Sequence, residues 1–165
     1  MRRRGIGLLL LPLAFLAVLA LGAGVAQAAK DKVVVAFGSN IPTLDPHMHV
    51  SRLAHIADYH LYDTILYRDP KNHYRPGPCL ATSWKSLNAT TWELKLRQGV
   101  KFHNGEPFNA EAVKFSLDRI LNPAEKSLIR GNFTWIKEVK VVDDFTVQLI
   151  TAKPFPAAAE YLTLA

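Results

Sequence analysis

Four histidines lie close together in the chain, at His47, His49, His55 and His60. Imidazole nitrogens are common ligands of Zn²⁺ and related metal ions, so their mutual spacing decides whether they could form a metal site. His55 and His60 are five residues apart, which separates them by about 140° around a helix. They therefore do not share a helix face, and we interpret the four as scattered polar histidines near a loop. No metal site is predicted.

The sequence gives no sign of a catalytic centre. Gly-x-Ser-x-Gly, His-Glu-x-x-His and the phosphate-binding Gly-x-x-x-x-Gly-Lys-Ser/Thr motif are all missing from the sequence. Asp143 and Asp144 are adjacent between two apolar runs, which is typical of a hairpin turn and not of an acid/base pair. We therefore predict a protein that is not an enzyme and has no cofactor.

The histidines follow a run of residues typical of a strand. Val33–Phe37 is continuously apolar, which predicts a strand buried on both faces, and it ends before Asn40. Ligands of open α/β sheets bind beyond the carboxyl ends of strands, so Asn40 is a candidate ligand residue. Ser51 is a plausible N-cap for a helix that reaches Leu61. Its predicted apolar face consists of Leu53, Ile56, Ala57 and Leu61.

The second half of the chain mixes strands and helices irregularly, which favours an α+β fold. Thr91–Leu96 alternates apolar and polar residues as a half-buried strand does, with Trp92 expected in the core. Asn109 is the predicted N-cap of the next helix. The segment 74–78 reads as a loop, and 136–151 reads as a hairpin. The predicted core stripe of the helix consists of Val113, Leu117, Ile120 and Leu121.

The N-terminus has the pattern of a cleavable signal peptide. Three arginines at positions 2–4 precede a nearly continuous apolar run, and Ala26-Gln27-Ala28 supplies a cleavage site after Ala28. A single membrane anchor is the alternative. Without the three arginines, the 20 Lys and Arg fall to 17 against 14 Asp and Glu, a net charge of +3. No dense basic patch remains, so nucleic acid is not an expected partner. Cys79 is the one cysteine, which excludes an intrachain disulfide.

Six segments, taken in order, resemble the solute-binding proteins of peptide and nickel ABC importers, family 5 of the extracellular solute-binding proteins. They are Thr43–Pro46, Tyr62–Leu66, Gly77–Trp84, Trp92–Gly105, Pro107–Glu111 and Asp143–Val147. Two departures are Cys79, where the family is usually apolar or small, and Ala112, where it is commonly acidic.

The resemblance implies a mixed α/β, periplasmic-binding-protein-like fold of which this chain holds a part. We expect a signal peptide at 1–28, the start of ligand-binding lobe I at 29–60 and an accessory α+β subdomain at 61–165, with the second lobe absent. The implied function is capture of peptides or similar small solutes in the periplasm, by a monomer, for delivery to a membrane permease. The alternatives are a nickel or metal-chelate carrier of the same family and a fragment of a secreted hydrolase.

The resemblance also implies that the loop of His49, Val50, Ser51 and Arg52 contacts the ligand, together with Asn40. Arg52 would pair with a carboxylate, and the backbone of Val50 and Ser51 would pair with the peptide main chain. The alternative for Arg52 is an exposed residue in the first turn of a helix.

Overall fold

The computed structural model describes residues 34–36, 38 and 40–164. The predicted signal peptide at 1–28 lies outside these residues. The predicted strand Val33–Phe37 is wrong over its described part, because residues 34–36 form no strand and Val34 and Val35 are largely exposed. Within the described residues no strand pairs with this segment, so its backbone has no ladder partner there. Nor do the described residues include a helix that is both long and apolar enough to cross a membrane.

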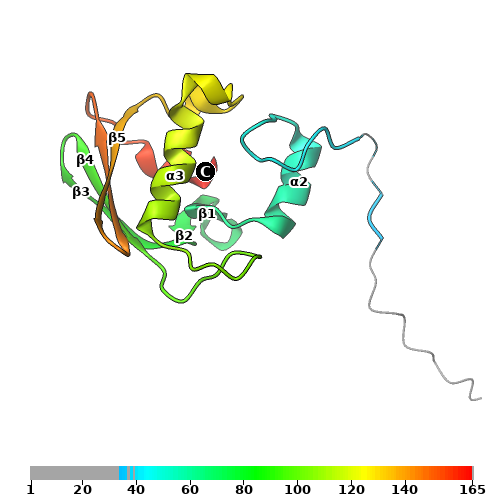
Figure 1. The fold of residues 1–165 in the computed structure, drawn as a ribbon, viewed down its shortest axis with the longest axis horizontal. Coiled ribbons are helices and arrows are strands. Elements are labelled where there is room, and N and C mark those ends of the chain that lie inside the picture. The colour runs from blue at the N-terminus through cyan, green and yellow to red at the C-terminus, as the bar shows by residue number, and fades with distance from the viewer. Residues whose placement is uncertain (1–33, 37, 39, 165) are drawn as a thin grey trace, which may run out of the picture. The chain divides into compact units, whose positions relative to one another are not determined.

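Most of the structure between residues 37 and 165 is organised around a four-stranded antiparallel sheet (Figure 1). Its strand order is β3-β4-β6-β5. The hairpin of β5 and β6 therefore pairs, through β6, with β4, which is the strand predicted from the alternation in Thr91–Leu96. Both the predicted strand and the predicted hairpin are confirmed. The strands are β3 (Ala81–Asn88), β4 (Thr91–Leu96), β5 (Ile136–Asp143) and β6 (Thr146–Thr151).

The alternation in β4 places its apolar side chains in the core. Leu94 and Leu96 are buried, and Leu94 pairs with Val147 across the sheet. Trp92 is partly buried against the same core, and its Nε1 donates a hydrogen bond to the carbonyl of Phe155 at 3.2 Å. The predicted core position of Trp92 is therefore confirmed.

The helix α3 (Ala110–Leu121) packs against β5 and β6, and it runs beside the strands of the sheet in Figure 1. Asn109 caps it, because its side-chain oxygen accepts the backbone N–H of Ala112 at 3.0 Å. Three residues of the predicted stripe are buried and the fourth is partly buried: Val113, Leu117, Ile120 and Leu121. The helix ends before Pro123, as predicted.

A small two-stranded sheet joins β1 (Leu66–Asp69) to β2 (Arg75–Pro78). The prediction of a loop at 74–78 is wrong except at Tyr74, because residues 75–78 pair with β1 in spite of two prolines. Pro76 and Pro78 lack an N–H to donate, but within the described residues β2 has only one paired neighbour, and an edge strand tolerates proline. The remaining short elements are α4 (Ala158–Tyr161), η1 (Pro70–Asn72), η2 (Pro123–Glu125), η3 (Arg130–Asn132) and η4 (Leu162–Leu164). The predicted mixture of helices and sheet is confirmed.

Candidate functional site

The helix α2 (Arg52–Leu61) and the loop before it carry most of the candidate ligand residues. Ser51 has extended backbone angles, and its hydroxyl oxygen accepts the N–H of Ala54 at 3.5 Å. At the other end, the N–H of Tyr62 bonds to the carbonyl of Asp58 at 2.8 Å. The helix and its predicted N-cap are confirmed.

The fully buried residues of α2 lie outside its predicted apolar face. The buried residues are Ala54 and Asp58, whereas Ile56 is 43% exposed and Leu61 is exposed as well. In the described part of the chain Ile56, which belongs to the predicted apolar face, borders a cavity. An acidic side chain on the buried face of a helix is unusual unless a partner compensates its charge.

The loop that leads into α2 is anchored to α3 through Asp45. Its carboxylate accepts the backbone N–H of His47 at 3.0 Å, which is the turn-capping contact expected of an Asp-Pro loop. It also receives two hydrogen bonds from the Arg119 guanidinium, one of them at 3.2 Å from Nη1 to Oδ1. The carbonyl of His47 accepts from the N–H of Leu128 and the hydroxyl of Ser127, both at 3.0 Å. These contacts hold the loop against α3 at Asp45 and against residues 127–128 at His47.

This anchor shifts the pKa values of the groups that form it. The hydrogen bond from Arg119 lowers the pKa of Asp45, and the same contact raises the pKa of Arg119. Burial lowers the pKa of His47, and the nearby Arg119 charge lowers it further. At neutral pH the anchor is therefore an ion pair beside a neutral imidazole.

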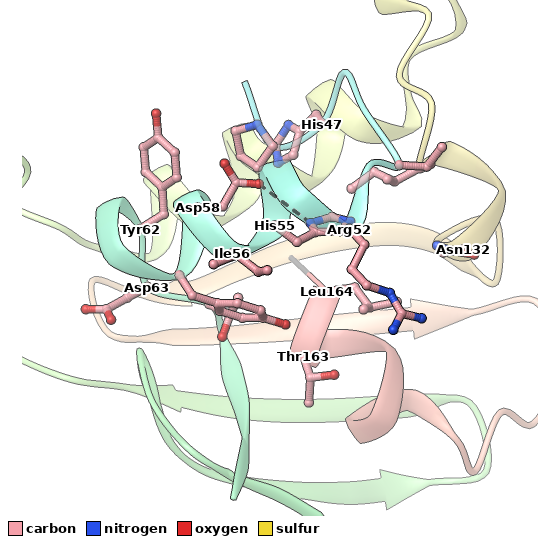
Figure 2. Close-up of a pocket in the computed structure, with 15 residues that line it drawn as sticks. His47, Arg52, His55, Ile56, Asp58, Tyr62, Asp63, Asn132, Thr163 and Leu164 are labelled. Atoms are coloured by element: carbon pink, nitrogen blue, oxygen red, sulfur yellow. Dashed lines mark ion pairs between the residues drawn. The ribbon is translucent and has the colours of Figure 1, made fainter. Parts of the chain in front are cut away.

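Beside α2 lies a cavity of about 500 Å³, a size typical of small-molecule sites (Figure 2). Its apolar lining includes Ile56, Tyr59, Tyr62 and Ile129. Tyr62 is held in place, because its hydroxyl donates to the carbonyl of Leu44 at 3.0 Å. The polar lining consists of His47, Arg52, His55, Asp58, Asp63, Thr64, Asn132 and Thr163.

Val50 and Arg52 are the two predicted ligand residues that line the cavity. Val50 is 69% exposed and Arg52 is exposed, and Figure 2 shows the Arg52 side chain extending away from His55 and Asp58. Ser51 uses its hydroxyl as the helix cap. His49 is buried against Asp58, and Asn40 is exposed but is not part of the cavity lining.

A group of three potential metal ligands was missed at the sequence level. One ligand atom each from His49, His55 and Asp58 lies within 4.8 Å of the others. His60 is not part of this group, as expected from its spacing to His55 on the helix. Its ring nitrogen Nδ1 lies 2.7 Å from the carbonyl oxygen of Ile56. The available signal was the i, i+3 spacing of His55 and Asp58, which places both on one face of α2.

Cys79 and Trp135 are held by contacts outside the cavity. Cys79 is partly buried, and burial raises the pKa of its thiol, so its reactive thiolate is disfavoured. Trp135 stacks on Phe155 with ring centroids 4.6 Å apart and donates a hydrogen bond to the carbonyl of Asn132. Neither side chain lines the cavity beside α2.

A mixed α+β unit with a cavity whose walls combine apolar, aromatic and polar side chains has the features of a small-molecule binding site. Residues 75–165 match the model of the bacterial extracellular solute-binding proteins, family 5 (middle part). The chain belongs to this family, which confirms the resemblance seen in the sequence.

The similar proteins are binding proteins. The glutathione-binding protein GsiB of Shigella dysenteriae serotype 1 is 38% identical over 141 residues, which cover 85% of this chain and 27% of that protein. Among solved structures, NikZ from Campylobacter jejuni, in complex with Ni(L-His), is 27% identical with a TM-score of 0.67, over 77% of this chain and 25% of that one. OppA from Burkholderia pseudomallei shares the fold at 20% identity with a TM-score of 0.68, over 73% of this chain and 26% of that one. The chain spans about a quarter of the length of these relatives.

Proposed function

We propose that this chain is part of the extracytoplasmic solute-binding component of an ABC importer, which captures peptides or similar small solutes for a membrane permease. Family membership carries this proposal. The similarity to glutathione-binding proteins favours a short peptide, because glutathione is itself a tripeptide. In this function the ligand stabilises a closed state through its higher affinity for that state, and no chemical step is needed.

The cavity beside α2 supports the proposal through its chemistry. Its walls offer apolar and aromatic surface to a ligand, and Arg52 offers a cation that the described residues leave without a carboxylate within salt-bridge distance. A guanidinium can bind the carboxylate of a peptide through two parallel hydrogen bonds. We propose that Arg52 is the anionic anchor and that Val50 and Ser51 contribute backbone contacts.

The other parts of the proposal concern the remaining candidate ligand residues, the division of the chain, its oligomeric state and its location. Asn40 would contact the ligand from outside the α2 cavity, whereas His49 would act by holding the loop against Asp58. We also propose a signal peptide at 1–28, a division into 29–60 and 61–165, a monomeric state, a periplasmic location, and the absence of enzymatic activity and of nucleic-acid binding.

Calorimetric titration with glutathione and with a panel of di- and tripeptides tests the role of Arg52. We expect Arg52→Ala to weaken binding by about 10- to 100-fold, because a hydrogen bond to a charged group contributes roughly 1.5–3 kcal/mol. Arg75→Ala is the matched control, since Arg75 is also exposed but does not line the cavity. Equal affinities for the two variants would exclude Arg52 as the anchor.

A nickel or metal-chelate carrier is the second candidate. It is favoured by the imidazoles of His47 and His55 in the cavity lining and by the similarity to NikZ. Under this alternative a Ni²⁺–histidine complex would bind more tightly than any peptide in the same titration, and His47→Gln would weaken its binding.

A further inference from the structure

The buried face of α2 presents polar atoms that lack hydrogen bonds. His49 is 2% exposed and the Asp58 side chain is 9% exposed. His49 Nε2 lies 2.8 Å from Asp58 Oδ2, yet neither imidazole nitrogen and neither carboxylate oxygen makes a hydrogen bond with a described residue. The distance is that of an ion pair, but the groups are not aligned as a hydrogen bond requires. Buried polar groups without partners are costly, so a missing partner is the natural explanation.

A third ligand atom completes the group from the solvent side. His55 Nδ1 lies 3.6 Å from the same carboxylate oxygen, and the His49 and His55 rings are 4.8 Å apart between centroids. Figure 2 shows His55 and Asp58 side by side on α2, joined by the dashed ion pair. The His55 side chain is 43% exposed, so an ion could enter past it.

We propose that His49, His55 and Asp58 bind a first-row divalent metal ion such as Zn²⁺. Zinc with ligands at about 2.0–2.2 Å in a tetrahedron holds neighbouring ligand atoms about 3.3–3.6 Å apart. The separation of 3.6 Å between His55 and Asp58 fits this spacing, and the separation of 2.8 Å between His49 and Asp58 is about 0.5 Å shorter, so the ion would move these two side chains slightly apart. Two imidazole nitrogens and one carboxylate oxygen form a three-residue donor set that leaves the fourth position open.

The ion would add a link between the loop before α2 and the helix itself, beside the Ser51 N-cap and the hydrogen bond from Tyr62 to Leu44. His49 belongs to the loop before α2, and His55 and Asp58 belong to the helix itself. Binding therefore fixes the loop of His49 to Arg52 against the helix. His55 and Asp58 also line the cavity, so an ion bound by them would lie at the cavity wall. This resident ion does not depend on the peptide ligand proposed above.

Zinc titration of the purified chain tests the site directly. The chain is produced without a histidine tag, freed of metal with a chelator and titrated with Zn²⁺ in a calorimeter at a pH above the imidazole pKa, since the ligands must be deprotonated. We expect one zinc per chain at this site. His55→Ala is the main variant, because its partial exposure makes misfolding less of a concern, and circular dichroism verifies the fold.

The expected result is a loss of at least about 10-fold in zinc affinity for His55→Ala, since removing even an outer-shell partner of a metal ligand costs 10- to 100-fold. His60→Ala is the matched control on the same helix and should bind as the parent does, because His60 lies outside the group. Asp58→Asn gives a second test. Co²⁺ bound to the parent should show the visible absorption of a four-coordinate site, which is lost in both site variants. Equal zinc affinity for His55→Ala and the parent, or a loss caused by His60→Ala instead, would overturn the proposal.

Discussion

Replacing Asp45 by Asn tests whether the loop before α2 is held by its ion pair with Arg119. Both side chains are 30% exposed, so solvent screens the pair only in part. A fully exposed ion pair contributes up to about 1 kcal/mol, whereas hydrogen bonds to a charged partner contribute roughly 1.5–3 kcal/mol. With two hydrogen bonds at a partly exposed site, we expect Asp45→Asn to lower the free energy of unfolding by about 1–2 kcal/mol at pH 7.

The pH dependence follows from the lowered pKa of Asp45. Its value in the folded state lies below the ordinary 3.8, so the folded protein binds this proton less readily than the unfolded chain does. The stabilisation is therefore fully present above about pH 4 and is lost as the pH falls through the folded-state pKa. The difference in the free energy of unfolding between the parent and Asp45→Asn should therefore shrink to near zero once the pH is below the folded-state pKa of Asp45.

Urea unfolding followed by tryptophan fluorescence at several pH values measures this difference. Asp118→Asn is the matched control, because Asp118 pairs with Lys114 at i, i+4 on the surface of α3. Such a pair contributes only about 0.3–0.5 kcal/mol. If Asp45→Asn is no more destabilising than Asp118→Asn at pH 7, or if its effect does not change with acid, the loop is not held in this way.

Three further predictions concern the core, the turns and the thiol. Phe133→Ala should lower the free energy of unfolding by about 3–5 kcal/mol, because Phe133 is fully buried; a loss below 1 kcal/mol in urea unfolding would contradict its place in the core. Gly105→Ala should lower the free energy of unfolding by about 1 kcal/mol, because Gly105 has φ +89°. Gly131→Ala is the control and should be nearly neutral, since an added Cβ meets no atom within 4 Å at either position. Equal unfolding midpoints for the two variants would disprove the turn geometry at Gly105. Cys79 should react slowly with iodoacetamide at pH 7 and faster only at alkaline pH, since its pKa is raised; alkylation at the rate of a free thiol would show that it is more exposed.

The elements with strong local signals were predictable from the sequence. Asn109 and the apolar stripe that follows it define α3 within a dozen residues, and the alternation around Leu94 defines β4. Both signals depend on neighbours in the chain, and the structure confirms both. The strand β2 was missed because Pro76 and Pro78 argue against a ladder, and only the pairing with β1 shows that one exists.

The site was less predictable because its contacts join distant positions. Asp45 and Arg119 are 74 residues apart, and no pattern around either one identifies the other as its partner. The spacing of Leu53, Ile56, Ala57 and Leu61 gives an apolar face of α2 but not its burial, since burial depends on what packs there. His49, His55 and Asp58 come together because the loop folds back on its own helix, which depends on backbone geometry that spacing alone does not give.

Thermal unfolding of the complete gene product with a panel of short peptides tests solute binding most directly. A ligand that binds only the folded state adds about 2.7 kcal/mol of stability at a concentration 100 times its dissociation constant, so the unfolding temperature should rise with peptide concentration. Mass spectrometry of the recovered peptide should find it unchanged, as expected of a binding protein. No rise with any peptide, or a peptide recovered in cleaved form, would contradict the proposed capture of peptides for import.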